Sequence, residues 1–179
     1  MRATAQGIEN KSMRAYIRVD TRMSRKGITV ARRVHCRPED CNCLAVRQAA
    51  RHITQFYDQF LAPSGLRTTQ FSILAKLRQL DPMTINTLAA EMVMDRTTLG
   101  RNILPLERDG LITVEQSSSD RRSKELRLTI TGEARLRAGI KGWVEAQRQF
   151  ERAFGAKRST DMRALLHAVA ATDLGATTV

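Results

Sequence analysis

Four polar side chains that could read a nucleic acid lie within one short stretch: Arg96, Thr97, Thr98 and Arg101. Arginine forms paired hydrogen bonds with guanine in the DNA major groove, and the threonine methyl packs on the methyl of thymine. Asp95 before them is a favoured helix N-cap, while Leu99, Ile103 and Leu106 share one face at helical spacing. The stretch therefore predicts a helix with one buried side and one side suited to a groove. The alternative is a core helix with a solvated basic face.

A shorter helix and a tight turn are predicted just before this one. In residues 84–94, Ile85, Leu88 and Met92 fall at helical spacing. Two short helices joined by about four residues, the second with polar groups at its start, are typical of the helix-turn-helix DNA-binding motif. Gly110 suits the left-handed residue that ends the second helix.

A β-hairpin is predicted after the second helix. Residues 111–116 and 125–129 favour strands, and the turn-forming residues 117–124 lie between them. The tip of this hairpin carries three charged side chains: Asp120, Arg121 and Arg122. A hairpin with arginines beside a groove-reading helix indicates a winged helix.

In order and spacing, residues 43–173 resemble the multiple-antibiotic-resistance regulator (MarR) family of bacterial transcription factors. The segments that carry the resemblance are Leu88-Ala-x-x-Met92, Asp95-Arg-Thr-Thr98, Leu106-Glu-x-x-Gly-Leu-Ile112, Asp120-x-Arg122, Leu128-Thr129 and Gly132. The resemblance implies that residues 96–101 enter the major groove of double-stranded DNA. It also implies that Arg122 reaches a minor groove, that Asp120 orients it, and that DNA binding represses transcription.

Pro105 departs from the family pattern because it lies inside the predicted recognition helix. A proline there removes the hydrogen bond to the Arg101 carbonyl and costs about 3 kcal/mol unless the helix kinks. It also pushes Leu104 away from helical geometry. A bend after Arg101 is expected, with the groove-facing turns left intact.

The predicted fold is mainly α with a small β-hairpin, in four parts. A basic extension (1–40) precedes a first dimerisation helix (41–66), the winged helix-turn-helix (67–130) and C-terminal dimerisation helices (131–179). The first helix is expected over residues 42–61, and the last ends near Gly175. The expected caps of the other long helices are Thr68 or Thr69, Thr131, and Ser159 or Thr160.

A heptad-like apolar seam follows the first C-terminal helix. Its members are Leu136, Ile140, Trp143, Gln147, Phe150 and Phe154. This seam could pack within one subunit, but in the resembling family the first and last helices of two chains interlock into a two-fold dimer. A homodimer would also place two recognition helices about one DNA turn apart, on an inverted repeat.

Positive charge is concentrated at the N-terminus. The chain carries a net +12, of which residues 1–38 contribute +8. We interpret residues 1–40 as a largely disordered basic arm that either contacts DNA or is passive, with Met23 as an alternative start. No apolar run is long enough to span a membrane and no export signal is evident, so a cytoplasmic protein is expected.

Three cysteines lie near the start of the first long helix. Cys36, Cys41 and Cys43 are an odd number, which disfavours a disulfide framework. Together with His35 they match no standard zinc spacing, so neither a metal nor a cofactor is expected. Cys43 falls in the first helical turn, where the helix dipole favours reactivity. The alternative is a small buried side chain at a helix interface.

One branch of the resembling family, the organic-hydroperoxide sensors, has a similar pattern here. The reactive cysteine and its partners match Cys43, Arg51 and Tyr57, but Arg47 stands where the branch has a tyrosine. Cys41 could act as a resolving thiol after local unwinding. A peroxide is thus one effector that the resemblance implies.

A small aromatic acid is the other effector considered, bound between the DNA-binding lobe and the dimerisation helices. The side chains suspected of lining that pocket are Arg47, Arg51, His52, Tyr57 and Trp143. An arginine among them could pair with the carboxylate. Each could instead be a structural ion-pair or core residue.

An enzyme is disfavoured by the sequence. His35, His52 and His167 are scattered without carboxylate partners, and there is no Gly-rich phosphate loop. The preferred interpretation is a transcriptional regulator that binds an inverted-repeat operator as a homodimer and is released by a small molecule or an oxidant. The alternative is a basic winged-helix module that coats nucleic acid without specificity or binds a protein.

Overall fold

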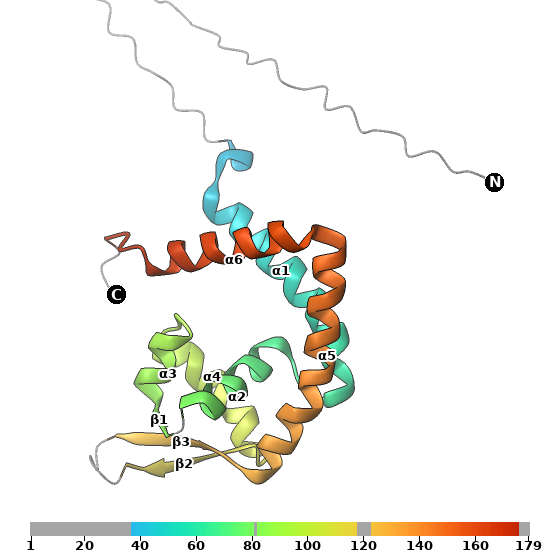
Figure 1. Cartoon of the computed structure of the whole chain (residues 1–179). Coiled ribbons are helices and arrows are strands. Elements are labelled where there is room, and N and C mark those ends of the chain that lie inside the picture. Colours follow the sequence, from blue (N-terminus) through green and yellow to red (C-terminus); the bar gives the residue numbers. More distant parts are fainter. Residues whose placement is uncertain (1–36, 81, 118–122, 176–179) are drawn as a thin grey trace, which may run out of the picture. The chain divides into compact units, whose positions relative to one another are not determined.

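Helices make up most of the chain, as the apolar residues at helical spacing predict (Figure 1). The computed structural model describes residues 37–80, 82–117 and 123–175. The chain forms two units, Met1–Asp40 and Cys41–Val179. In the first unit the described part contains one turn of 3-10 helix, η1 (Pro38–Asp40). The basic arm predicted for residues 1–40 lies almost wholly outside the described residues.

The second unit has the element order of a winged helix between long helices. Its elements are α1 (Asn42–Leu61), the 3-10 turn η2 (Ala62–Ser64), α2 (Thr68–Leu80), β1 (Met83–Thr84), α3 (Ile85–Glu91), α4 (Arg96–Arg108), β2 (Ile112–Gln116), β3 (Lys124–Leu128), α5 (Ile130–Phe154) and α6 (Ala156–Ala171). The predicted fold class is confirmed.

In the described part of the chain the sheet has three antiparallel strands in the order β1-β3-β2, one more than the predicted hairpin. β2 and β3 form the hairpin, with Ile112 opposite Leu128. The additional strand β1 places Met83 opposite Leu126, and both side chains are buried. A strand of two residues has no periodicity of its own, so the sequence could not reveal it.

Helices α2, α3 and α4, the sheet and the start of α5 share one apolar core, and we call them together the winged-helix lobe. Fully buried leucines come from each of its main elements: Leu74 of α2, Leu88 of α3, Leu99 of α4, Leu126 of β3 and Leu136 of α5. Each buried leucine stabilises the fold by about 1.5–3 kcal/mol relative to an exposed one. In Figure 1, α2, α3 and α4 lie on one side of the sheet, and α5 leads from the sheet toward α6.

Two glycines allow α5 to approach other parts of the chain closely. A Cβ on Gly132 would clash with the carbonyl oxygen of Leu111, and one on Gly142 would clash with that of Phe60 in α1. The long helix therefore contacts the lobe at its start and α1 at its middle. At Gly142 the backbone of α5 lies directly against the backbone of α1.

Three predicted helix starts are wrong. α2 begins at Thr68, so neither Thr68 nor Thr69 precedes it as the N-cap. α5 is capped by Thr129, whose hydroxyl accepts a hydrogen bond from the Gly132 amide at 2.9 Å, and not by Thr131. The Thr129 amide also bonds to the Leu111 carbonyl, which fixes this residue at the strand end.

α6 begins at Ala156 and ends at Ala171, earlier at both ends than predicted. Ser159 is inside it, fully buried.

Candidate nucleic-acid interface

The start of α4 is held by Asp95, as predicted. One carboxylate oxygen accepts the Thr98 amide at 2.8 Å, and the other accepts the Thr98 hydroxyl at 2.6 Å. These hydrogen bonds lower the pKa of Asp95. A charged cap at the positive end of the helix fixes its first turn. The Thr98 hydroxyl proton is therefore used within the cap.

The two faces of α4 differ as predicted. Leu99, Ile103 and Leu106 are buried in the lobe core, whereas Arg96, Thr97 and Arg101 are exposed along with Thr98. Gly100 lies between them, with no atom within 4 Å of the position a Cβ would take. This gap lets a bulky partner approach the helix backbone. Sequence reasoning missed Leu104, which is 63% exposed.

Pro105 does not interrupt α4. The helix is continuous from Arg96 to Arg108, and Gly110 follows with φ +67°, the left-handed conformation that was predicted. Leu104 stays in the helix, so the expectation that the proline pushes it out of helical geometry is wrong. Ile103 and Leu106, on either side of this dipeptide, are both anchored in the core, which holds the local backbone helical.

The turn between α3 and α4 contains a strained residue. Val93 has φ +51°, in the left-handed region that β-branched side chains avoid, and it is 75% exposed. The turn closes through the Met94 amide, which donates to the Ala89 carbonyl at 2.9 Å. This conformation could not be predicted from the sequence, since valine is not a turn former.

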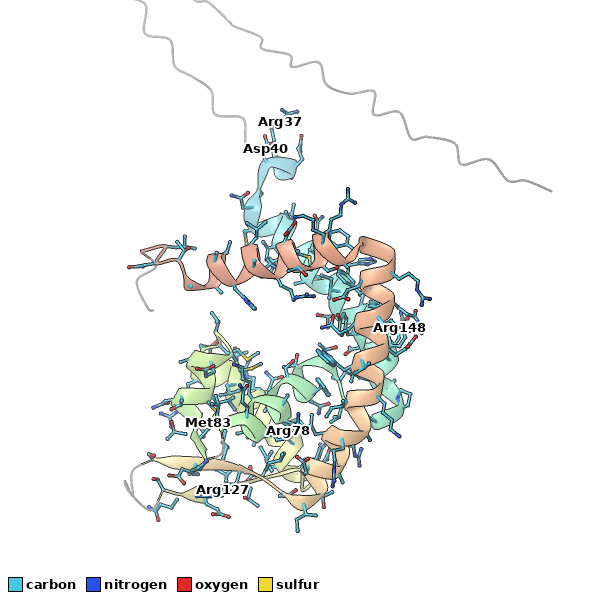
Figure 2. All side chains as sticks on the ribbon, in the orientation of Figure 1. Arg37, Asp40, Arg78, Met83, Arg127 and Arg148 are labelled. Atoms are coloured by element: carbon cyan, nitrogen blue, oxygen red, sulfur yellow. The ribbon has the colours of Figure 1, made fainter. Side chains whose placement is uncertain are left out.

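The strands of the wing carry a charge arrangement that sequence reasoning missed. Glu115 on β2 lies opposite Glu125 on β3. Arg127 pairs with both, its guanidinium nitrogens lying 3.6 Å from a Glu115 oxygen and 3.1 Å from a Glu125 oxygen. Figure 2 shows Arg127 on the sheet. The arginine offsets the repulsion between two facing carboxylates. The predicted tip residues Asp120, Arg121 and Arg122 lie outside the described residues.

The predicted sensing residues fall on α1. Cys43, Arg47 and Arg51 are all exposed in the single chain. Cys41 is the N-cap of α1 in an extended conformation, and its sulfur accepts the Leu44 amide at 3.4 Å. Cys41 therefore lies just outside the helix and Cys43 just inside it.

Tyr57, the fourth sensing candidate, is engaged elsewhere. Its hydroxyl donates to Gln147 Oε1 of α5 at 2.6 Å. Partial burial raises the pKa of Tyr57, an effect that Arg163 opposes and Glu151 adds to. Tyr57 thus joins α1 to α5 and has no hydrogen bond with Arg47 or Arg51 among those described.

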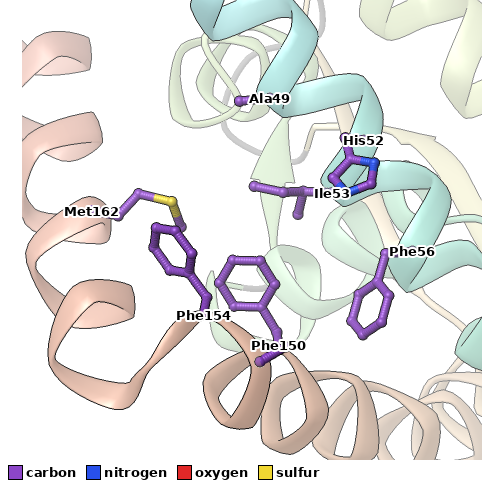
Figure 3. A pocket seen from close by; sticks show the side chains of 8 residues that line it. Ala49, His52, Ile53, Phe56, Phe150, Phe154 and Met162 are labelled. Carbon is purple, nitrogen blue, oxygen red and sulfur yellow. The ribbon is translucent and has the colours of Figure 1, made fainter. Parts of the chain in front are cut away.

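An apolar cavity of about 400 Å³ lies between α1, α5 and α6. Its lining residues are Ala49, His52, Ile53, Phe56, Phe150, Ala153, Phe154 and Met162. In Figure 3, Phe150, Phe154 and Met162 face Ile53 and Phe56 across it. His52, one of the side chains suspected of binding an aromatic acid, lines this cavity. Trp143 instead stacks on Phe71, with ring centroids 6.3 Å apart.

The described residues contain no group of three or more His, Cys, Asp or Glu side chains that could hold a metal ion. Nor is any helix there both long enough and apolar enough to cross a membrane.

Known proteins similar to this chain are transcriptional regulators. A family profile described as "MarR family" matches residues 66–124. One of them is the transcriptional regulator MosR from M. tuberculosis, whose crystal structure is of a complex with DNA. MosR is 37% identical in sequence to this chain, and the two structures superpose with a TM-score of 0.64. That match covers 73% of this chain and 96% of MosR.

Curated relatives match over shorter spans. An uncharacterised HTH-type transcriptional regulator of Bacillus cereus is 30% identical over 96 residues, which is 54% of this chain and 63% of the relative. The chain therefore spans less than two thirds of that relative's length. The organic hydroperoxide resistance transcriptional regulator of Bacillus subtilis is 26% identical over 98 residues, 55% of this chain and 67% of the relative.

Proposed function

Because this chain belongs to the MarR family of DNA-binding transcriptional regulators, we propose that it is a repressor that binds an inverted-repeat operator as a homodimer. A small molecule or an oxidant then releases it from the DNA. MarR-type regulators are not enzymes. The observation that carries the proposal is the start of α4, where exposed arginines and threonines follow a charged cap and the opposite face is buried.

Reading of DNA is assigned to α4 and the wing. Arg96, Thr97 and Arg101 face the major groove, with Thr98 at the helix start, and Arg101 forms paired hydrogen bonds with a guanine. Arg122, with Asp120 and Arg121 beside it, contacts the neighbouring minor groove. In this arrangement residues 67–130 are the DNA-binding domain.

Pairing of two chains is assigned to the helices on either side, residues 41–66 and 131–179. Large apolar side chains on α1, late α5 and α6 are exposed in the single chain: Val46, Val144, Phe154, Leu165, Leu166 and Val169. Several large apolar side chains exposed on the same helices favour an interface with another protein chain. A second copy that covers it sets two α4 helices side by side, which suits two half-sites about one DNA turn apart.

An oxidant is the signal that the structure supports better. Cys43 is exposed in the first turn of α1, and Cys41 beside it is already outside the helix. A hydroperoxide ROOH would oxidise the Cys43 thiol to a sulfenic acid, with release of ROH. Condensation with the Cys41 thiol would then form a disulfide and release water. Because the Cys41 sulfur accepts the Leu44 amide as the cap of α1, this bond requires the cap and the first turn of α1 to open.

A salt titration tests the DNA-binding proposal. The protein is titrated with a duplex selected by the wild type from a random library and with a scrambled duplex, over a range of salt concentrations. A sequence-reading dimer keeps about 10³-fold or greater preference for the selected site. A protein that coats nucleic acid shows equal affinity and an equal salt slope on both duplexes, and this result would refute the proposal.

Arg101→Ala separates base reading from phosphate binding. The variant is expected to lose about 1–3 kcal/mol on the selected site and to relax the preference at one base pair of each half-site. Arg108→Ala is the matched control, because Arg108 is exposed at the other end of α4 and pairs with Asp109. An equal loss on every duplex would assign Arg101 to the phosphate backbone instead.

Cys43→Ser tests the oxidant. The variant should bind the selected duplex like the wild type and remain bound after treatment with an organic hydroperoxide. Release of the oxidised Cys43→Ser protein would remove Cys43 from the mechanism. Release of the wild type by aromatic acids alone would favour the small-molecule effector.

A further inference from the structure

Helix α2 takes its N-terminal cap from another helix. The residue before it is Arg67, whose side chain has no hydrogen-bond acceptor. Asp58 of α1 supplies the acceptor: its Oδ1 receives the Thr68 amide at 2.7 Å and the Thr68 hydroxyl at 2.7 Å. The Arg67 guanidinium lies 3.5 Å from Asp58 Oδ2. A carboxylate on α1 thus holds the positive end of α2.

This cap is charged and well defined. The side chain of Asp58 is 22% exposed. Partial burial raises its pKa, but the hydrogen bonds from Thr68 and the nearby Arg67 guanidinium outweigh that effect, so the pKa of Asp58 is below its ordinary value. Hydrogen bonds to a charged acceptor are short and directional, whereas apolar packing is not directional. The cap therefore fixes the angle between α1 and α2 more tightly than apolar packing along α5 does.

The cap lies between the two functional parts of the molecule. On one side, α1 carries Val46, an exposed apolar residue of the proposed dimer interface. On the other, α2 is joined rigidly to the helix-turn-helix, since Leu74 and Leu77 share the core with Leu99 of α4. Lys76 of α2 also pairs with Glu91 of α3 at 2.8 Å. A tilt of α2 against α1 would therefore move α4.

We propose that Asp58 is a positioning residue that sets the separation of the two recognition helices on DNA. It does so by fixing α2, and with it the whole lobe, at one angle to the dimerisation helix. The inference rests on the proposed homodimer, in which operator spacing reports the distance between the two α4 helices. Asp58 itself contacts no DNA in this account.

The test measures affinity of the full-length protein against operator spacing. The duplexes carry the two half-sites of the library-selected site at the selected spacing, or with one base pair added or removed. Each base pair changes the separation by about 3.4 Å and rotates one half-site against the other. The wild type should prefer the selected spacing at least about tenfold, which corresponds to 1.4 kcal/mol.

Asp58→Ala should flatten this preference by about threefold or more while the protein remains dimeric. Arg101→Ala is the matched control: it should weaken binding at every spacing and keep the wild-type ratios. Loss of stability alone would lower all affinities together, so the ratio isolates positioning. If Asp58→Ala does not fold, Asp58→Glu replaces it, because the longer arm keeps the charge and should shift the preferred spacing.

Two results would overturn the inference, and they differ. Wild-type ratios in Asp58→Ala, or an unshifted spacing in Asp58→Glu where that variant replaces it, would refute the positioning role and leave the paired DNA binding intact. The absence of any spacing preference in the wild type would refute the paired binding, and the inference with it.

Discussion

The winged-helix lobe and the helices that flank it bury their apolar residues to very different extents. The buried core cluster runs from Leu61 to Leu136. Beyond it, α6 has one buried residue among those described, Ser159, while Leu165, Leu166 and Val169 are exposed. The lobe has a buried core, whereas the flanking helices carry apolar side chains that are exposed in the single chain. The proposed pairing of two chains depends on this difference.

The largest contrast is expected from the same substitution made in each region. Leu99 is fully buried, so Leu99→Ala should cost about 2–5 kcal/mol in the free energy of unfolding. Leu165 is 68% exposed, so Leu165→Ala should cost less than about 1 kcal/mol in a dissociated chain but weaken pairing. Urea unfolding of dilute protein measures both. Equal costs would contradict the contrast.

Two glycines in helix interiors should respond with opposite signs. Gly142→Ala places a methyl against the Phe60 carbonyl and should destabilise the fold by about 1–3 kcal/mol. Gly100→Ala meets no atom within 4 Å and should stabilise α4 by about 1 kcal/mol, the usual helix preference for alanine. Thermal unfolding of the two variants checks the signs. Stabilisation by both would show that α5 and α1 are not in close contact.

The strained turn of the helix-turn-helix should be relieved by one substitution. Val93→Gly removes the side chain from a left-handed position and should stabilise the lobe by about 0.5–1 kcal/mol, with little burial lost. Val144→Gly is the control, because Val144 is exposed within helix α5 and glycine should destabilise it. If Val93→Gly is also destabilising, the turn does not hold this conformation.

The smallest effect is expected in the stability of the fold at acid pH. The pKa of Asp95 is lowered in the folded chain by its hydrogen bonds with Thr98, so its contribution to stability is present above its unfolded pKa, near pH 4. That contribution is lost as the pH falls through the lowered folded value. Asp95→Ala should remove this part of the pH dependence, which an NMR titration of the Thr98 amide would follow. An unchanged acid profile would mean that the cap does not form.

Sequence could predict those features whose signals are local. Asp95 and Gly110 mark the ends of α4, and the spacing of Leu99, Ile103 and Leu106 marks its buried face, because a helix is specified by residues a few positions apart. The Pro105 rule failed for Leu104 because a local preference was overridden by core contacts on both sides.

Features set by distant partners were not predictable. β1 exists because Met83 pairs with Leu126, the cap of α2 comes from Asp58, and Gly142 is needed because Phe60 passes it. Thr129 and Thr131 are equally good caps in the sequence, and the bond from the Thr129 amide to Leu111 decides between them. In the candidate interface, the pairing of Arg127 with Glu115 and Glu125 depends on strand register.

The stoichiometry of the protein on DNA tests the central claim most directly. Native mass spectrometry of the full-length chain, free and bound to its selected duplex, measures how many copies assemble. We expect a dimer in solution and two chains on each duplex, with no complex of one chain at saturation. A monomer that binds the selected duplex singly with full affinity would contradict it.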